Sequence, residues 1–394
     1  GEDKGYVGTF LKQVKEVVHT CKNKDIKIVT NAGGLNPSSM ANEIEKILKE
    51  AKLDLKVAYI TGDNLMPELE DLKNKGEDFV NIDKNISLNE SGLGVLTANA
   101  YLGAWGIKEA LDQGADIVVC PRVTDAAVVI GPAAWKFNWQ RNDYDKLAGA
   151  LAAGHIIECG CQATGGNYAF FKEVDSFDNV GYPIAEIQED GSFFITKHPH
   201  TGGLVSVGTV TAQILYEIST PAYINPDVIA HFDTLEIKQV AKDKVFVSGC
   251  RGSSPTDTHK VCMNLAGGYR NGMELILTGL DIEEKAEVFT DTLFNSIGGK
   301  DQFDEVSICL DRNDKENPNT NEEAMAFLRI NVKSKNQELV GRLFNAKIIE
   351  LALANYPGFT ASGGSKPGGP ILIYWPALIC LLYTSDAADE ITGV

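Results

Sequence analysis

Asp116-Ile-Val-Val-Cys-Pro-Arg-Val-Thr-Asp125 is the stretch that decides the fold. Residues 115–120 form a short, β-branched apolar run, which predicts a buried strand. A polar loop and a helix rich in Ala and Val follow it. The same order of strand, polar loop and helix occurs at residues 26–52, and another strand is expected at 55–60. Short strands that alternate with helices are typical of βαβ units, so we expect an α/β, Rossmann-like parallel-sheet domain.

The pattern changes at about residue 174, where strands and helices mix without regular alternation. We therefore expect three parts: an α/β domain over 1–173, an α+β portion over 174–378, and an artefactual or disordered tail over 379–394. The tail Cys380-Leu-Leu-Tyr-Thr-Ser-Asp-Ala-Ala-Asp-Glu390 resembles a translated sequencing adapter. The predicted helices include 94–113, 145–158, 204–217, 282–297 and 337–354, and the predicted strands include 193–196, 235–240, 244–248, 274–278, 306–310 and 326–332.

Composition excludes several classes of protein. The chain has 394 residues, and its 44% hydrophobic content can bury a sizeable core, which excludes overall disorder. A formal net charge of −18 without a basic block argues against nucleic-acid binding. No apolar run approaches the ~20 residues of a membrane span. Eight cysteines in so long a chain do not form a dense disulfide framework, so we expect a cytoplasmic protein with reduced thiols. The missing initiator Met and the tail predict a fragment.

The loop after the first strand, Asn31-Ala-Gly-Gly-Leu-Asn-Pro37, is the first candidate site. Gly33 and Gly34 let the backbone pass close to a ligand, and the next helix offers free N–H groups at its start. Asn31 and Asn36 add amide groups that bind a carboxylate, a phosphate or an oxyanion. The alternative is a tight turn with an Asx cap.

Polar side chains also follow the other two strands of the predicted sheet. Arg122 has the fork geometry that binds a carboxylate or phosphate, and Asp125 is a candidate base. Asp63 ends the neighbouring strand. Ligands of open α/β sheets bind at the carboxyl ends of strands, so the three loops together predict one polar site. The alternative is an Arg122–Asp125 ion pair that caps the helix.

A dense polar stretch follows at Gly154-His-Ile-Ile-Glu-Cys-Gly-Cys-Gln-Ala-Thr-Gly-Gly-Asn167. His155 and Glu158 are three residues apart and share one face of a helix, which favours a general acid/base pair. Gly165, Gly166 and Asn167 form a further loop of close backbone approach. The alternative for His155 is a buried histidine with one satisfied nitrogen.

His198 and His200 lie two residues apart and, with an acidic residue, could bind a transition metal, as in a metal-dependent hydrolase. Only these two ligands are visible, so we favour a turn that carries exposed histidines. We therefore assign no metal ligands, and the residues name no cofactor. The loop 250–259 contains Ser, Asp and His but lacks the Gly-x-Ser-x-Gly elbow of serine hydrolases.

Taken together, the stretches 31–37, 116–125, 147–160 and 162–167, with Tyr356-Pro-Gly-Phe359 and Tyr374-Trp-Pro376, resemble the acyclic terpene utilisation (AtuA-like) family. The resemblance covers about residues 25–378. Against the family pattern, the first strand with its Gly-rich loop and the smaller ferredoxin-like domain that often follows are missing, so we expect an N-terminal truncation.

The resemblance implies a catabolic enzyme of geraniol- or citronellol-type degradation that acts on a branched acyl-CoA or its acid. A lyase, hydratase or hydrolase step fits best, with Asp125, His155 or Glu158 moving the proton and Asn31, Gly33, Gly34, Asn36, Asp63, Arg122, Gly165, Gly166 and Asn167 binding the substrate. The alternative is a non-catalytic scaffold subunit that presents substrate to an acyl-CoA carboxylase. Expected partners are the small-molecule substrate, a further copy of the chain or that carboxylase. Nucleic acid and membrane are not expected partners.

Overall fold

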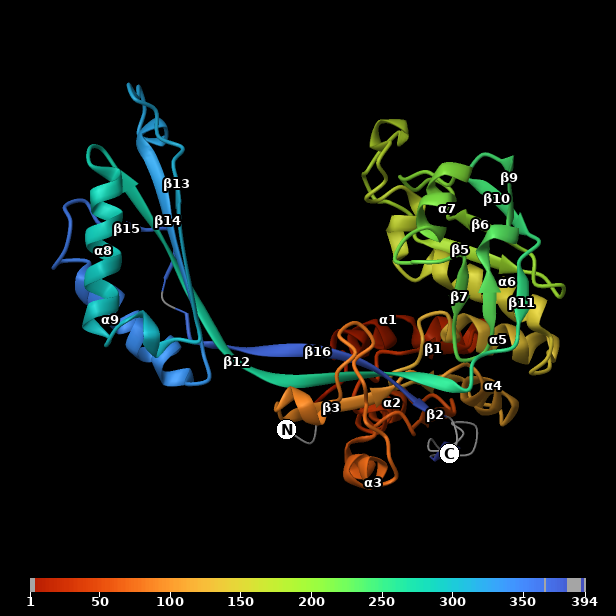
Figure 1. Ribbon diagram of the computed structural model, residues 1–394. Coiled ribbons are helices and arrows are strands. Elements are labelled where there is room, and N and C mark those ends of the chain that lie inside the picture. The colour runs from red at the N-terminus through yellow and green to blue at the C-terminus, as the bar shows by residue number, and fades with distance from the viewer. Residues whose placement is uncertain (1–3, 365, 381–390, 393–394) are drawn as a thin grey trace. The chain divides into compact units, whose positions relative to one another are not determined.

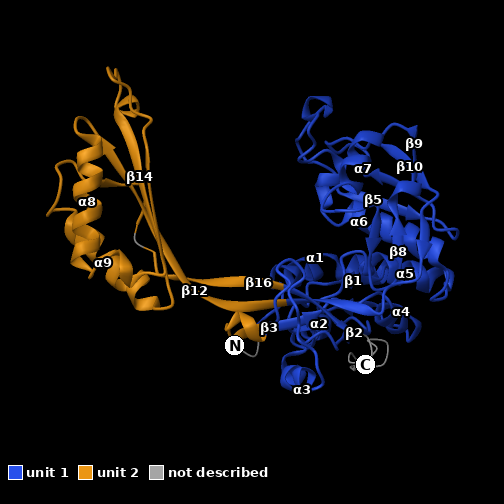
Figure 2. Cartoon of the chain, viewed as in Figure 1, with its two compact units in different colours: residues 1–88, 97–262, 376–394 blue, residues 89–96, 263–375 orange. Residues whose placement is uncertain are grey.

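The computed structural model describes residues 4–364, 366–380 and 391–392. The chain forms two compact units (Figure 2): unit 1 contains residues 1–88, 97–262 and 376–394, and unit 2 contains 89–96 and 263–375. The expected division after residue 173 falls inside unit 1. The reason is helix α6 (Tyr144–Ile157), which precedes that position but packs against β5 (Pro183–Ile187), β8 (Ile229–His231) and β11 (Arg251–Ser253) that follow it.

Unit 1 contains the predicted parallel sheet. Its strands are β1 (Ile28–Thr30), β2 (Val57–Ile60) and β4 (Ile117–Val119), and β4 pairs with both of the others. Helices α1 (Thr9–Lys24) and α2 (Pro37–Ala51) share a buried apolar cluster with these strands. The mixed α/β class is therefore confirmed. The N-cap of α2 is Asn36, whose side chain accepts a hydrogen bond from the Ser39 N–H.

The predicted helix over residues 94–113 is wrong in its first half. Strand β3 (Val95–Ala100) precedes a shorter helix, α4 (Trp105–Asp112). Apolar runs of this length fit a strand as well as a helix. Pairing of β3 with the long strand β12 (Thr258–Thr278) decides the outcome.

The rest of unit 1 surrounds α6, whose residues from Leu147 to Ile156 are all buried. A helix that is apolar on every side belongs in a core. One antiparallel sheet has the order β5-β6-β10-β9, and a second has the order β11-β8-β7. The remaining bounds are α3 (Leu69–Asn74), α5 (Ala127–Phe137), β6 (Phe193–Lys197), α7 (Val207–Ile214), β7 (Ala222–Ile224), β9 (Glu236–Ala241), β10 (Lys244–Ser248) and β17 (Ile391–Thr392).

Unit 2 is built on an antiparallel sheet in which β12 pairs with β14 (Met325–Ser334), and β14 pairs with β13 (Glu305–Asp311). Only the last five residues of β12 were predicted. Helices α8 (Ile282–Ser296) and α9 (Phe344–Leu351) bury the apolar face of the sheet. The predicted helix 337–354 is α-helical only over α9, because residues 339–343 before it form a π-helix. The other strands are β15 (Thr360–Ala361) and β16 (Gly369–Cys380).

The expected tail starts inside β16, because Ile379 and Cys380 end that strand and Ile379 is buried. Residues 381–390 and 393–394 lie outside the described residues. All eight cysteines are free thiols. In the described ranges, every helix is too short or too polar to span a bilayer.

A buried carboxylate fastens the β7–β8 hairpin to the start of α4. Asp227 lies in the turn of the hairpin, and its two oxygens accept the Ala104 N–H at 2.9 and 3.1 Å. Gly103 permits this contact, since a Cβ there would lie 2.4 Å from the carboxylate. Burial raises the pKa of Asp227 to about 6, although the hydrogen bond from the Ala104 N–H and the positive charge of Arg141 lower it. At neutral pH Asp227 is therefore ionised, and its buried charge lowers the free energy of unfolding.

Asp227→Asn should remove that cost and keep the hydrogen bond, because the amide oxygen also accepts. A carboxyl with a raised folded-state pKa binds its proton more tightly when folded, so its contribution to stability falls as pH rises from about 4 to about 6. Relative to wild type, the variant should gain about 3 kcal/mol of unfolding free energy between pH 4 and pH 7. Urea unfolding followed by tryptophan fluorescence at both pH values measures this gain. The exposed Asp301→Asn should show none, and a gain independent of pH would contradict the assignment.

Candidate functional site

The loops that follow β1 and β4 meet as predicted. The Asn31 Nδ2 group donates a hydrogen bond to Asp125 Oδ1 at 3.0 Å, across 94 residues of sequence. The loop after β2 joins them, because Asp63 Oδ2 lies 3.4 Å from the Arg122 backbone N–H. Parallel strands end at the same edge of a sheet, and this shared edge brings the three loops together.

The remaining predicted residues of the first loop shape the turn. A Cβ at Gly33 would lie 2.4 Å from the Cys120 carbonyl oxygen, so only glycine lets this loop pack against the end of β4. Gly34 has a φ of +57°. Asn36 caps α2 and donates a hydrogen bond to the Lys4 carbonyl oxygen. Within this loop, Asn31 is the residue whose side chain reaches Asp125.

Asp63 and Arg122 occupy different environments at this edge. Asp63 is buried and accepts a 2.7 Å hydrogen bond from Asn99 Nδ2. Burial raises the pKa of Asp63, although hydrogen bonds from Asn99 and Arg122 oppose the shift. The exposed Arg122 guanidinium lies over the Tyr101 ring, 5.7 Å from its centroid. Asp63 is therefore a buried brace for the loop, and Arg122 extends the polar edge beside Tyr101.

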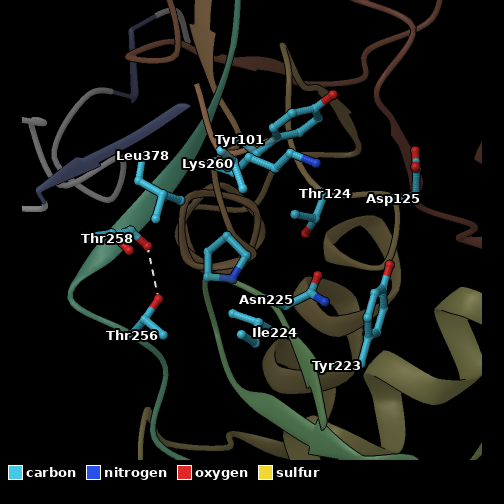
Figure 3. A pocket seen from close by; sticks show the side chains of 12 residues that line it. Tyr101, Thr124, Asp125, Tyr223, Ile224, Asn225, Thr256, Thr258, Lys260 and Leu378 are labelled. Atoms are coloured by element: carbon cyan, nitrogen blue, oxygen red, sulfur yellow. Dashed lines mark hydrogen bonds between the residues drawn. The ribbon is translucent and has the colours of Figure 1, made fainter. Parts of the chain in front are cut away.

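A pocket of about 520 Å³ opens next to Asp125 within unit 1 (Figure 3). Its volume is in the range of small-molecule sites. Apolar side chains from distant segments form part of the wall, and hydroxyl, amide, ammonium and carboxylate groups form the rest. The lining residues are Ile82, Tyr101, Thr124, Asp125, Tyr223, Ile224, Asn225, Pro226, Thr256, Thr258, Lys260 and Leu378.

Tyr223 and Asp125 are two of the titratable residues that line the pocket, and their charges interact. Figure 3 shows the Tyr223 hydroxyl directed toward Asp125. Burial raises the pKa of Tyr223 to about 12, and the negative charges of Glu158 and Asp125 add to the shift, against a hydrogen bond with Asn225. Tyr223 therefore stays protonated at neutral pH and acts as a hydrogen-bond donor.

Thr124 offers a further sign that the pocket receives a polar ligand. Its Oγ1 atom is buried and has no hydrogen-bond partner among the residues that the structure describes. Buried hydroxyl groups nearly always have a partner, so an unpaired one in a pocket wall marks a place for a ligand atom or a water.

His155 lies behind the pocket wall and does not line it. The side chain is 1% exposed, and its ring packs 5.2 Å from the ring of Tyr223 and 5.6 Å from that of Phe232. Nε2 lies 3.2 Å from the Ile214 carbonyl oxygen, so this nitrogen carries a hydrogen. Nδ1 lies 3.2 Å from Glu158 Oε1, but their alignment does not make a hydrogen bond. The observed geometry makes His155 a support for Tyr223, with Glu158 acting on the same phenol through its charge.

The loop with Gly165, Gly166 and Asn167 is also outside the pocket lining. Gly165 has a φ of +102°, and a Cβ at Gly166 would lie 2.9 Å from the Cys161 carbonyl oxygen. Asn167 Nδ2 donates to Gln162 Oε1 at 3.2 Å. These contacts account for the loop as a compact turn after the short helix Gly160–Thr164.

Several pocket residues have no counterpart among the residues singled out from sequence. Lys260 lies at the start of β12, where its carbonyl oxygen accepts the Tyr101 N–H at 2.9 Å. Tyr223 and Asn225 come from the β7–β8 hairpin that Asp227 holds in place. No motif surrounds them in the sequence; the short apolar run Val261-Cys262-Met263 after Lys260 was the available sign of a strand. Among the described residues, no three His, Cys, Asp or Glu side chains gather as a metal site, including around His198 and His200.

Comparison with known proteins gives one family. No curated protein and no solved structure matches the chain. A family model described as acyclic terpene utilisation family protein AtuA matches residues 1–382. This match is longer than the resemblance over 25–378, and it starts at residue 1, so it does not support the expected N-terminal truncation. The description associates the family with the use of acyclic terpenes. The chain belongs to the acyclic terpene utilisation family AtuA.

Proposed function

We propose that this protein is a catabolic enzyme that binds a branched, terpene-derived acyl thioester or its free acid in the pocket beside Asp125. We propose a hydratase or lyase step, in which a proton moves next to the substrate carbonyl. One observation carries the proposal: a single pocket combines a carboxylate, a protonated phenol and an ammonium group with an apolar wall. The family description supports the terpene origin of the substrate.

The wall of the pocket matches such a substrate. Ile82, Ile224 and Leu378 are 49%, 60% and 48% exposed, which is unusual for large aliphatic side chains gathered in one pocket. Covering them with a methyl-branched chain would remove apolar surface from water, at about 25 cal/mol per Å². The exposed Lys260 ammonium offers a charge for a carboxylate or an enolate oxygen at the same place.

In the proposed reaction each polar residue has a separate task. Asp125, oriented by Asn31, takes the proton from the carbon next to the carbonyl, and the C–H electron pair moves onto the carbonyl oxygen. Lys260 and the Tyr223 hydroxyl stabilise the negative charge that develops there. Collapse of this enolate expels the hydroxyl group of the next carbon, which leaves as water with the proton held by Asp125, and the reverse sequence adds water to the double bond.

A hydrolase with a covalent intermediate fits less well. Among the described residues that line the pocket there are threonine hydroxyls but no histidine to activate them. Burial raises the pKa of the nearby Cys159 thiol, against a hydrogen bond from Gln213, and the charge of Glu158 raises it further, so the reactive thiolate is disfavoured. Proton transfer by Asp125 needs neither group.

Proton transfer can be measured without knowledge of the full reaction. We expect the protein to exchange the proton next to the carbonyl of a methyl-branched acyl-CoA, or of its free acid, for solvent deuterium, as followed by mass spectrometry. Asp125→Asn should lower this exchange by at least about 10²-fold, because the amide cannot act as a base. Asp54→Asn, which makes the same change at an exposed carboxylate outside the pocket, should leave it unchanged.

Binding tests the other half of the proposal. The thioester or the acid should raise the melting temperature through linkage, and coenzyme A alone should raise it less. A melting shift without any deuterium exchange would contradict the enzyme assignment. That result would favour a scaffold subunit that presents the substrate to an acyl-CoA carboxylase.

Tyr223→Phe and His155→Ala should distinguish a residue that acts on the substrate from one that stabilises the fold behind the pocket. Tyr223→Phe removes one hydroxyl from the pocket and should reduce exchange by about 10²-fold with little change in melting temperature. His155→Ala opens a cavity in the packed core and should lower stability by about 2–4 kcal/mol. Thermal melts and exchange rates of both variants check this difference. Unchanged stability in His155→Ala would contradict the role of this ring in the packed core.

A further inference from the structure

Unit 2 presents one open face of its sheet. Helices α8 and α9 pack on the other face, where Leu275 of β12 and Leu328 of β14 are fully buried (Figure 1). Side chains alternate along a strand, so Arg270 and Gly272 of β12 share the open face with their neighbours on β14 and β13. Exposed residues on it include Arg270, Asn331 and Ser307.

In one region of this face the carboxylates outnumber the cation. Arg329 Nε lies 2.6 Å from Glu274 Oε2, and its Nη1 pairs with Asp311. Two carboxylates therefore neutralise this guanidinium, which needs no ligand.

Four residues from Glu274 along β12, at Arg270, cations outnumber carboxylates on this face. Arg270 and Lys333 are direct partners in the β12–β14 register, and Glu305 is opposite Lys333 on the other side. Like charges directly opposite each other in a sheet are destabilising. In the part of the chain that the structure describes, neither Arg270 nor Lys333 has a carboxylate oxygen within 4.0 Å, the limit for an ion pair. The chain has a net charge of −18, so this pair of cations stands out from its surroundings.

A hollow of about 420 Å³ lies beside the two cations. Gly272 lines it and is in register with Asn331, which is in register with Ser307. A Cβ at Gly272 would lie 2.3 Å from Asn331 Oδ1, so the missing side chain makes room for the amide. The hollow therefore offers an amide and a hydroxyl next to a guanidinium and an ammonium group.

We propose that this hollow binds the phosphate group of a small molecule. Arg270 offers a fork of donors, Lys333 a compact charge, and Ser307 and Asn331 add neutral hydrogen bonds, a set that suits a dianion with several oxygens. The charge of Glu305 opposes the anion, which limits affinity and gives the site a defined test. The site lies within unit 2 and does not depend on the function proposed for the pocket of unit 1.

Isothermal titration of the whole chain with inorganic phosphate and with adenosine 3′,5′-bisphosphate tests the proposal. Saturable binding of both indicates a site for any phosphate, and binding of the bisphosphate alone indicates a nucleotide phosphate. Each result supports the proposal, and no saturation by either below about 10 mM overturns it.

Variants assign the binding to the hollow. Arg270→Ala and Lys333→Ala should each weaken binding about tenfold, the usual effect of losing one charge-assisted hydrogen bond. Glu305→Gln should strengthen it, because an opposing charge is removed. Lys347→Ala makes the same change in net charge on α9, which packs on the other face, and should leave binding unchanged. Equal weakening by Lys347→Ala and Arg270→Ala would overturn the site and indicate general electrostatic attraction.

Discussion

The pairing of β4 with β1 on one side and with β2 on the other decides which side chains of unit 1 can meet. The parallel register places Ile117 beside both Ile28 and Val57, so all three strands end at one edge. The absence of a side chain at Gly33 then lets the first loop pack against the Cys120 carbonyl oxygen at the end of β4. As a result, the Asn31 amide reaches the Asp125 carboxylate, and every catalytic role proposed for Asp125 depends on that orientation.

The edge of the parallel sheet supplies only one side of the pocket. The β7–β8 hairpin supplies another, and Asp227 holds it in place. Tyr223 and Asn225 belong to a short hairpin that Asp227 fastens to the start of α4. A buried carboxylate with a raised pKa is an expensive tether. The same hairpin carries Tyr223, whose hydroxyl points toward Asp125. The unfavourable burial of the Asp227 charge therefore serves to fix the position of this phenol. His155 supports the phenol from behind.

How much of this could be predicted follows from how local each feature is. The strands and helices around Asp125 were predicted because each has its own apolar period and is followed by a polar loop. Strand β12 was predicted only near its end, since Gly267, Gly268 and Arg270 break the apolar pattern, and its 21 residues are held by pairing with distant strands. Lys260 and Tyr223 could not be predicted for the same reason: their place in the pocket depends on contacts far along the chain. The burial of His155 could not be predicted from the sequence, because its helix is apolar on all sides and shows no face that marks the core.

The charges in the pocket also link Asp125 to Tyr223. The carboxylate of Asp125 helps to raise the pKa of Tyr223, because a negative charge nearby opposes formation of a phenolate. The interaction is mutual, so a proton that arrives on Asp125 lowers the cost of removing one from Tyr223. In the proposed reaction this is the required order: the carboxylate takes a proton from the substrate, and the phenol then becomes a better donor to the oxygen that gains charge. The negative charge of Glu158 also opposes formation of the phenolate, after burial as the main cause of the raised pKa of Tyr223.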